Sequence, residues 1–281
     1  MDYQFLDSGN GYKLERFGKY TLSRPSGIAI WRKSLSEKEW KEADAGFSRE
    51  RENRWDWKGK APLDWQVKIS GIKMKCQATD FGHLGVFPEH ASYWTWMQER
   101  AQAFENRVKR PLSALNLFAY SGGATLALAK AGCLVCHVDS SKGMVDWARE
   151  NALLNDLGEA KIRWIVEDAL KFMQREVKRG KFYDAIILDP PSFGRGSKGE
   201  VFKIEEHVTP LLELSKKLMS PEADFILFSC HTPGFSPIVM NNLLQDVMKT
   251  RSGSIDSGEM VLSPEKGMRL PSGSYGRWRF D

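Results

Sequence analysis

The sequence has 281 residues, 42% of them apolar and 11% aromatic, which is enough for an ordered core in one large domain or two smaller ones. No apolar run approaches the roughly 18 residues of a membrane span, and the amino-terminal stretch MDYQFLDSGNGYKLERFG lacks the apolar segment of a signal peptide. The net charge of +5 permits contact with nucleic acid without requiring it. We therefore expect a soluble, cytoplasmic protein with no membrane partner.

Residues 1–90 predict a small β-rich domain. Apolar and polar residues alternate in 12–25 and 65–80, as in half-buried antiparallel strands. The stretch 37–55 between them is highly charged, and we expect a solvated insertion there. Tryptophans are concentrated in this part of the chain. Burial in a small core is their more frequent role, and stacking on RNA bases is the alternative.

Residues 91–281 predict an α/β domain. After a helix over 89–109, apolar strands alternate with amphipathic helices, and two further strands near the carboxyl end form a closing hairpin. This pattern predicts a doubly wound, mostly parallel, seven-stranded Rossmann-like sheet with helices on both faces. The five leading strands are expected at 113–119, 133–139, 162–168, 183–189 and 223–230.

The strand ends carry the residues expected to form a site. The first strand runs into the small-residue turn AYSGGATLA, the next three end at Asp139, Asp168 and Asp189, and the fifth ends at Cys230. In such sheets ligands bind outside the carboxyl ends of the strands, and an acid after the second strand can accept both hydroxyls of a ribose. Each acid alone could equally be a helix cap. Together they favour a nucleotide-like ligand.

Other ligand classes lack their motifs. The turn does not read G-x-G-x-x-G, as in a nicotinamide dehydrogenase, and no G-x-x-x-x-G-K-[ST] loop supports ATP hydrolysis. Cys133 and Cys136 form a C-x-x-C, but residues three apart on a strand point to opposite faces. We read them as core residues and predict no metal site.

Four segments in order resemble the motifs of class I S-adenosylmethionine-dependent methyltransferases: LNLFAYSGGATLALAKAG, HVDSSKGMVDWARENALLND, VEDALKFM and DAIILDPPSFG. The resemblance covers roughly residues 80 to 250. With TDFGHLGVFPEH just before them, the chain more narrowly resembles the RlmI-type family of 23S rRNA cytosine-C5 methyltransferases. Members commonly carry an amino-terminal PUA module for RNA, which we do not expect here because the sequence starts too late to contain one.

The resemblance implies a cofactor, S-adenosylmethionine, and roles for particular residues. Pro191, Ser192 and Phe193 would face the target base, together with Asp189. The residues implied in cofactor binding are Ala119, Tyr120, Ser121, Gly122, Asp139, Ser140, Asp168, Ala169, Asp189 and Pro190.

Cys230 is the candidate nucleophile. Methylation of cytosine C5 requires attack at C6, which a thiolate performs well, and Cys230 stands where the family has its cysteine-containing motif. Asp189 would assist by holding the base. The alternative is that Cys230 is a buried apolar residue, as free cysteines usually are.

Other functions stay open. Asp-Pro-Pro-aromatic turns also occur in methyltransferases that act on a base nitrogen or exocyclic amine without a cysteine. Here Ser192 comes before Phe193, which favours the C5 reaction modestly. A small-molecule methyltransferase and a non-catalytic RNA-binding protein on the same fold are further alternatives.

The expected partner is RNA, most simply ribosomal RNA, whose target base must be flipped out to reach the methyl donor. Basic side chains near the active edge could contact phosphates, although any one of them is more often a solvated surface charge. The sequence does not indicate the nucleotide or the oligomeric state. The basic candidates are Arg195, Lys198, Lys266, Arg269, Arg277 and Arg279.

Overall fold

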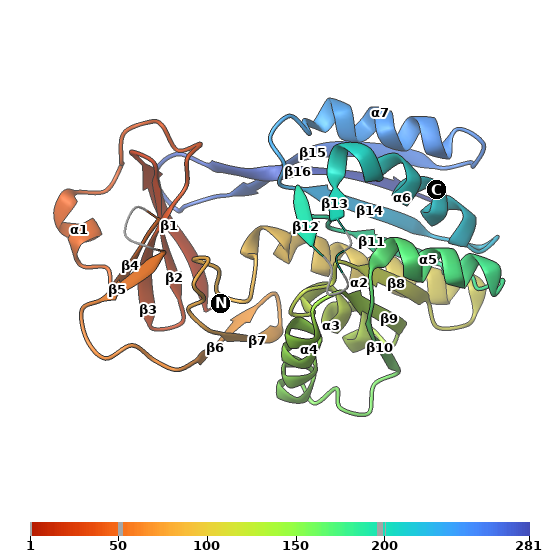
Figure 1. Cartoon of the computed structure of the whole chain (residues 1–281), viewed down its shortest axis with the longest axis horizontal. Coiled ribbons are helices and arrows are strands. Elements are labelled where there is room, and N and C mark those ends of the chain that lie inside the picture. The colour runs from red at the N-terminus through yellow and green to blue at the C-terminus, as the bar shows by residue number, and fades with distance from the viewer. Residues whose placement is uncertain (1, 50–52, 196–198, 200) are drawn as a thin grey trace. The chain divides into compact units, whose positions relative to one another are not determined.

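The structure is a computed structural model that describes residues 2–49, 53–195, 199 and 201–281, so Lys198 lies outside the described residues. The chain divides into two compact units (Figure 1). The small unit comprises residues 1–91 and 261–272, and the large unit comprises 92–260 and 273–281. Among the described residues, no helix is both long and apolar enough to cross a membrane.

The small unit is built on a five-stranded sheet in the order β1-β2-β3-β4-β5. Its neighbours pair antiparallel except for β3 and β4, which are parallel. A separate hairpin follows, and a short 3-10 helix, η1 (Pro88–His90), precedes the large unit. The strands are β1 (Tyr3–Gly9), β2 (Tyr12–Phe17), β3 (Tyr20–Pro25), β4 (Ala45–Ser48), β5 (Arg54–Trp57), β6 (Trp65–Ile69) and β7 (Ile72–Cys76).

The expected solvated insertion over 37–55 is wrong. Its described residues form helix α1 (Glu37–Lys41) and the strands β4 and β5. Ser36 and Glu39 form a capping box that starts the helix, and the helix buries Trp40. In β4 the side chains of Ala45 and Phe47 are buried. The described charged residues of this stretch are exposed, or half-buried in the case of Asp44, and alternate with buried positions, so their number hid the alternation.

The large unit contains the predicted seven-stranded sheet, in the order β10-β9-β8-β11-β14-β16-β15. The first five of these strands pair parallel, and β16 pairs antiparallel with β14. The doubly wound, mostly parallel Rossmann-like fold is therefore confirmed (Figure 1). The sheet strands are β8 (Ser113–Leu117), β9 (Leu134–Asp139), β10 (Ile162–Val166), β11 (Ala185–Leu188), β14 (Phe225–Cys230), β15 (Ser254–Leu262) and β16 (Leu270–Arg279).

Helices connect these strands, and a two-stranded hairpin follows β11. All four residues of β11 and all six of β14 are buried, as expected of central strands covered on both faces. One continuous core joins β8, β11 and β14 to side chains of α5, α6 and α7. The helices are α2 (Ala91–Val108), α3 (Gly123–Lys130), α4 (Lys142–Leu154), α5 (Ala169–Lys178), α6 (Ile204–Leu218) and α7 (Pro237–Met248), and the hairpin strands are β12 (Phe193–Arg195) and β13 (Val201–Lys203).

Candidate functional site

The turn between β8 and α3 is held in a conformation that brings its backbone to the sheet edge. Tyr120 and Gly122 have positive φ values of 51° and 90°. Gly122 is the N-cap of α3, and its amide donates to the carbonyl of Ala119 at 3.0 Å. A Cβ on Gly122 would lie 3.0 Å from the Cβ of Ala148 in α4, so a glycine is required both for the left-handed backbone and for this close packing.

Asp139, the last residue of β9, ties this turn to the next one. Its Oδ2 accepts the backbone N–H of Tyr120 at 2.9 Å, and its Oδ1 accepts that of Ser141 at 2.9 Å. Burial raises the pKa of the Asp139 carboxyl, and these two backbone hydrogen bonds oppose the rise. Each carboxylate oxygen has two lone pairs, so one on each oxygen stays available to the hydroxyls of a ligand.

A pocket opens at the carboxyl ends of β8, β9 and β10, and it brings together part of the predicted set. Asp139, Ser140, Asp168, Ala169 and Pro191 line it. The other predicted residues do not line this pocket: Ala119, Tyr120, Ser121, Gly122, Asp189, Pro190, Ser192, Phe193 and Cys230. The predicted roles of all of these residues, in cofactor binding, base binding or catalysis, stay predictions.

The pocket also contains residues that the sequence reasoning missed. The rings of Phe118 and Phe202 lie 5.2 Å apart and present apolar faces suited to a flat base. Phe118 lies inside the first motif and Glu167 lies next to Asp168, so the motifs could have identified both as pocket residues. Phe202 comes from β13, beyond the glycine-rich loop, where no periodicity pointed to it. The residues missed are Phe118, Val138, Glu167, Gly194 and Phe202.

Asp168 has two roles open to it. Its Oδ1 accepts the backbone N–H of Lys171 at 2.9 Å, so it is the N-cap of α5, which the sequence allowed as an alternative. It also lines the pocket, where its second oxygen can accept from a ligand. The neighbouring Glu167 is paired with Arg175 at 2.8 Å between Oε2 and Nη2.

Asp189 follows β11 and is oriented from the neighbouring strand β14. The hydroxyl of Ser229 donates to its Oδ1 at 2.8 Å, and Nε2 of His231 lies 3.8 Å from the same oxygen. Pro190 is buried, whereas Pro191, Ser192 and Phe193 are exposed, Phe193 by 52%. The two prolines thus hold an oriented carboxylate next to an exposed aromatic ring.

Cys230 ends β14, between Ser229 and His231, which both approach the Asp189 carboxylate. Its Sγ accepts the backbone N–H of Thr232 at 3.4 Å, and the hydroxyl oxygen of Thr232 lies 2.7 Å from that of Ser192. The Cys230 side chain is fully buried in the core. Burial raises the pKa of its thiol, against the hydrogen bond from Thr232. A nucleophilic cysteine needs the opposite shift.

The basic residues predicted to contact phosphates differ in their surroundings. Arg277 pairs with Asp256 at 2.6 Å and lies over the rings of Trp96 and Tyr275. Its charge is therefore largely balanced within the large unit. Arg279 donates to the hydroxyl of Ser254. Arg195, by contrast, lines the pocket and is exposed.

The side chains that line this pocket fit the adenosine part of S-adenosylmethionine. Asp139 offers lone pairs to ribose hydroxyls, Asp168 offers an acceptor to an amino group, and Phe118 with Phe202 offers apolar surface to a ring. The pocket lies where ligands bind in doubly wound sheets. These are properties of the residues themselves, independent of any relative.

Known proteins agree with this assignment. The sequence family described as S-adenosylmethionine-dependent methyltransferase matches residues 47–246. A solved S-adenosylmethionine-dependent methyltransferase from Agrobacterium tumefaciens is 38% identical with a TM-score of 0.94, and the match covers 99% of this chain and 90% of that one.

Two named relatives match a smaller part. The ribosomal RNA large subunit methyltransferase K/L of Pseudoalteromonas translucida is 32% identical over 171 residues, which is 60% of this chain and 23% of that protein. The ribosomal RNA large subunit methyltransferase I of Salmonella arizonae is 30% identical over 148 residues, 52% of this chain and 35% of that protein. The chain thus matches about a third or less of the length of either relative. By its motifs, its fold and its match over residues 47–246, the chain belongs to the family of S-adenosylmethionine-dependent methyltransferases.

Proposed function

We propose that this protein methylates a base of ribosomal RNA in the cytoplasm. The observation that carries the proposal is the Asp189–Pro190–Pro191 turn, whose last proline lines the cofactor-type pocket while Phe193 stays exposed. A flat base can stack on such a ring while its polar edge meets the carboxylate. The names of the two ribosomal RNA methyltransferases support RNA over a small metabolite as the substrate.

The chain's own residues would divide the work by position. Asp139 would hold the ribose of S-adenosylmethionine, and Asp168 with Phe118 and Phe202 would hold its adenine. The bound cofactor supplies an electrophilic methyl group. Asp189, fixed by the Ser229 hydroxyl, would accept a hydrogen bond from the target base and orient it.

Cytosine C5 is the finer target suggested by Cys230. A thiolate would add to C6 and make C5 nucleophilic; C5 would take the methyl group as S-adenosylhomocysteine leaves, and loss of the C5 proton to a base would then expel the thiolate. In this structure that reaction requires the buried Cys230 to become accessible to the base and to lose its proton, although burial raises the pKa of its thiol. Such a change would have to accompany RNA binding.

A base nitrogen is the second candidate, and the burial of Cys230 favours it. Transfer to an exocyclic amine needs a hydrogen-bond acceptor for the N–H of the amine and a surface on which the base can stack. Asp189 offers the acceptor and the exposed Phe193 offers the stacking surface, and neither role involves the buried cysteine. Of the two targets, the nitrogen is the one that the geometry supports better.

Labelled methyl transfer to undermethylated ribosomal RNA tests both. Asp189→Ala should lower the rate by about 10- to 100-fold, because it removes a charged hydrogen-bond acceptor worth roughly 1.5–3 kcal/mol. For a nitrogen target, Cys230→Ala should keep most of the activity and the label should appear on a methylated amine or ring nitrogen. Label recovered as 5-methylcytosine and abolished in Cys230→Ala would assign C5. No label in any ribosomal RNA, with S-adenosylhomocysteine still bound, would reject the proposed substrate.

A further inference from the structure

A second pocket lies wholly within the small unit, away from any residue used above. Its volume is about 140 Å³, and β2, β3, β4 and the segment 81–89 contribute its walls. This small-unit pocket is defined by the side chains of Lys13, Arg24, Phe47, Arg49, Phe81, His83, Phe87 and Glu89.

The small-unit pocket carries excess positive charge. Arg24 donates from Nε and Nη2 to the buried Glu15, and Nζ of Lys13 lies 3.2 Å from the same carboxylate, so one of these two cations is neutralised. Arg49 adds an exposed guanidinium. Burial lowers the pKa of His83, and Arg24, Arg49 and Lys13 lower it further, against Glu89, which raises it. Excess positive charge attracts a phosphate.

Aromatic rings line the same pocket. Phe81 is 74% exposed, so its ring is accessible to a ligand. The rings of His83 and Phe87 lie 5.3 Å apart, and the buried Phe47 forms part of the wall. Exposed aromatic rings beside cations are the usual surface on which an unpaired nucleobase stacks.

Glu89 gives the pocket a chemical preference. Its side chain is only 9% exposed, and among the described residues its Oε2 is buried without a hydrogen-bond partner. A buried carboxylate oxygen without a donor is costly. Glu89 lines the pocket, so a ligand N–H that enters it can pair with this carboxylate. The site therefore calls for a ligand with N–H donors.

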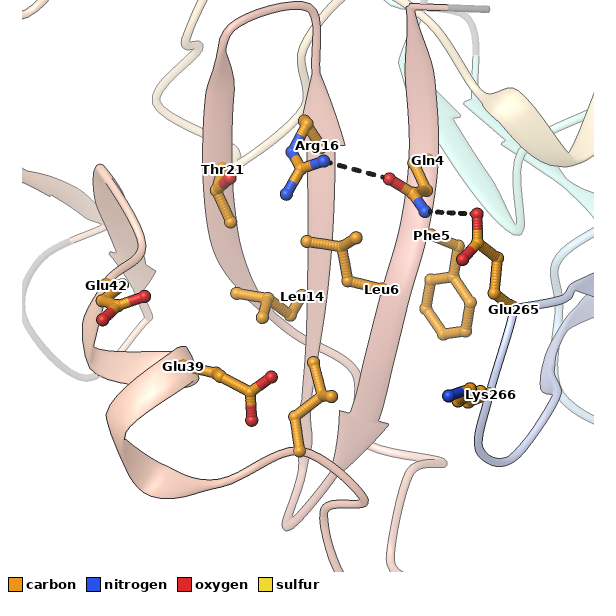
Figure 2. Close-up of a pocket in the computed structure, with 11 residues that line it drawn as sticks. Gln4, Phe5, Leu6, Leu14, Arg16, Thr21, Glu39, Glu42, Glu265 and Lys266 are labelled. Atoms are coloured by element: carbon orange, nitrogen blue, oxygen red, sulfur yellow. Dashed lines mark hydrogen bonds between the residues drawn. The ribbon is translucent and has the colours of Figure 1, made fainter.

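A larger pocket of about 410 Å³ in the same unit shows the contrast (Figure 2). There Gln4 accepts from Arg16 at 3.1 Å and donates to Glu265 at 3.1 Å, and Glu39 caps α1. None of the described residues that line it carries a buried polar atom without a partner. We assign no ligand to this larger pocket, because its polar groups are satisfied by one another or by solvent.

We propose that the small-unit pocket binds a guanine nucleotide of an RNA strand. Guanine presents N1–H and N2–H donors side by side, which suit Glu89, and its O6 and N7 accept hydrogen bonds from arginine or lysine. Its ring can stack on Phe81, and the excess positive charge suits the adjoining phosphate. The inference rests on the proposed RNA substrate, but it concerns binding and not methyl transfer.

Equilibrium binding of short RNAs tests it without cofactor or turnover. Fluorescein-labelled oligouridines of about ten nucleotides, carrying one central guanosine, adenosine or uridine, are titrated with the full chain. We expect the guanosine strand to bind about tenfold or more tightly than the other two. Equal affinity for all three would overturn the proposal. Free 5′-GMP that competes as well as the strand would assign the pocket to a free nucleotide and reject RNA as the source.

Matched variants assign the effect to the pocket. Glu89→Gln should remove the guanosine preference, whereas Glu42→Gln, an exposed carboxylate of the larger pocket, should keep it. Phe81→Ala should weaken binding of all three strands by about 5- to 100-fold. Ile30→Ala, which removes another exposed apolar side chain of the small unit, should not. An unchanged guanosine preference in Glu89→Gln would refute the assigned contact.

Cross-linking provides a readout that needs no variant. A strand with 6-thioguanosine at the central position should cross-link on irradiation to a peptide that contains residues 81–89. Cross-links confined to other peptides would overturn the pocket assignment. A protein that transfers no methyl group but keeps the guanosine preference and this cross-link would refute the proposed function alone.

Discussion

At the scale of single residues, a buried histidine behind the cofactor turn controls how the fold responds to acid. His137 in β9 is fully buried, and its Nδ1 lies 2.9 Å from the hydroxyl oxygen of Thr125 in α3. The same oxygen accepts the side-chain N–H of Asn116 at 2.9 Å. Among the described residues Nε2 has no hydrogen-bond partner.

We expect this histidine to destabilise the protein in mild acid. Burial, and then Arg149, lowers the pKa of His137 to about 3 from 6.5. As the pH falls below 6.5 the unfolded chain binds a proton that the native state cannot, so the free energy of unfolding falls by up to about 1.4 kcal/mol per pH unit. His137→Gln should remove this part of the slope in urea unfolding followed between about pH 7 and pH 5. Parallel wild-type and variant profiles would contradict the assignment.

At the scale of elements, the start of α3 depends on contact with α2. A Cβ on Gly123 would lie 2.3 Å from Cζ2 of Trp94, which is 3% exposed in α2. The helix can therefore begin at this place only with a glycine, and its position fixes the turn that carries Tyr120 and Gly122.

Gly123→Ala should accordingly destabilise the protein by about 1–3 kcal/mol, the usual cost of overpacking. It should also weaken S-adenosylhomocysteine binding, measured by calorimetry, because the cofactor turn shifts with the helix. Trp94→Leu shortens the opposing side chain, so the double variant should lose less stability than the sum of the single changes. Gly143→Ala in α4 is the matched control, since the nearest atom to its added Cβ is 3.9 Å away. Strict additivity of the two changes would show that the contact is not the cause.

The helices and strands also show which parts of the fold and of the site can be predicted from the sequence. Near-continuous apolar strands and turn residues predicted the large sheet and the acids at its edge, because these signals are local. The charged stretch 37–55 was misread because exposed charges outnumber its buried positions. The burial of Cys230, and the placement of Phe202 against Phe118, depend on strand register and on a distant hairpin. No local pattern carries that information.

At the scale of the whole molecule, the chain passes between its two units three times. Residues 261–272 return to the small unit from the hairpin formed by β15 and β16. There Leu262 and Leu270 complete a core cluster with Phe5 and Ala29, and all four side chains are at least 96% buried. The small unit is therefore not a continuous segment that ends near residue 91.

This discontinuity predicts that residues 1–91 alone will fold poorly. Without Leu262 and Leu270 the fragment loses the burial of two leucines, worth about 1.5–3 kcal/mol each, which is a large share of the stability of so small a unit. Joining 261–272 to the fragment through a glycine-serine linker should restore cooperative unfolding, followed by tryptophan fluorescence in urea. The same linked fragment with Leu262→Ser and Leu270→Ser should behave like 1–91 by itself. If 1–91 alone unfolds as cooperatively, and at the same urea concentration, as the linked fragment, the returning segment contributes nothing to the core of the small unit.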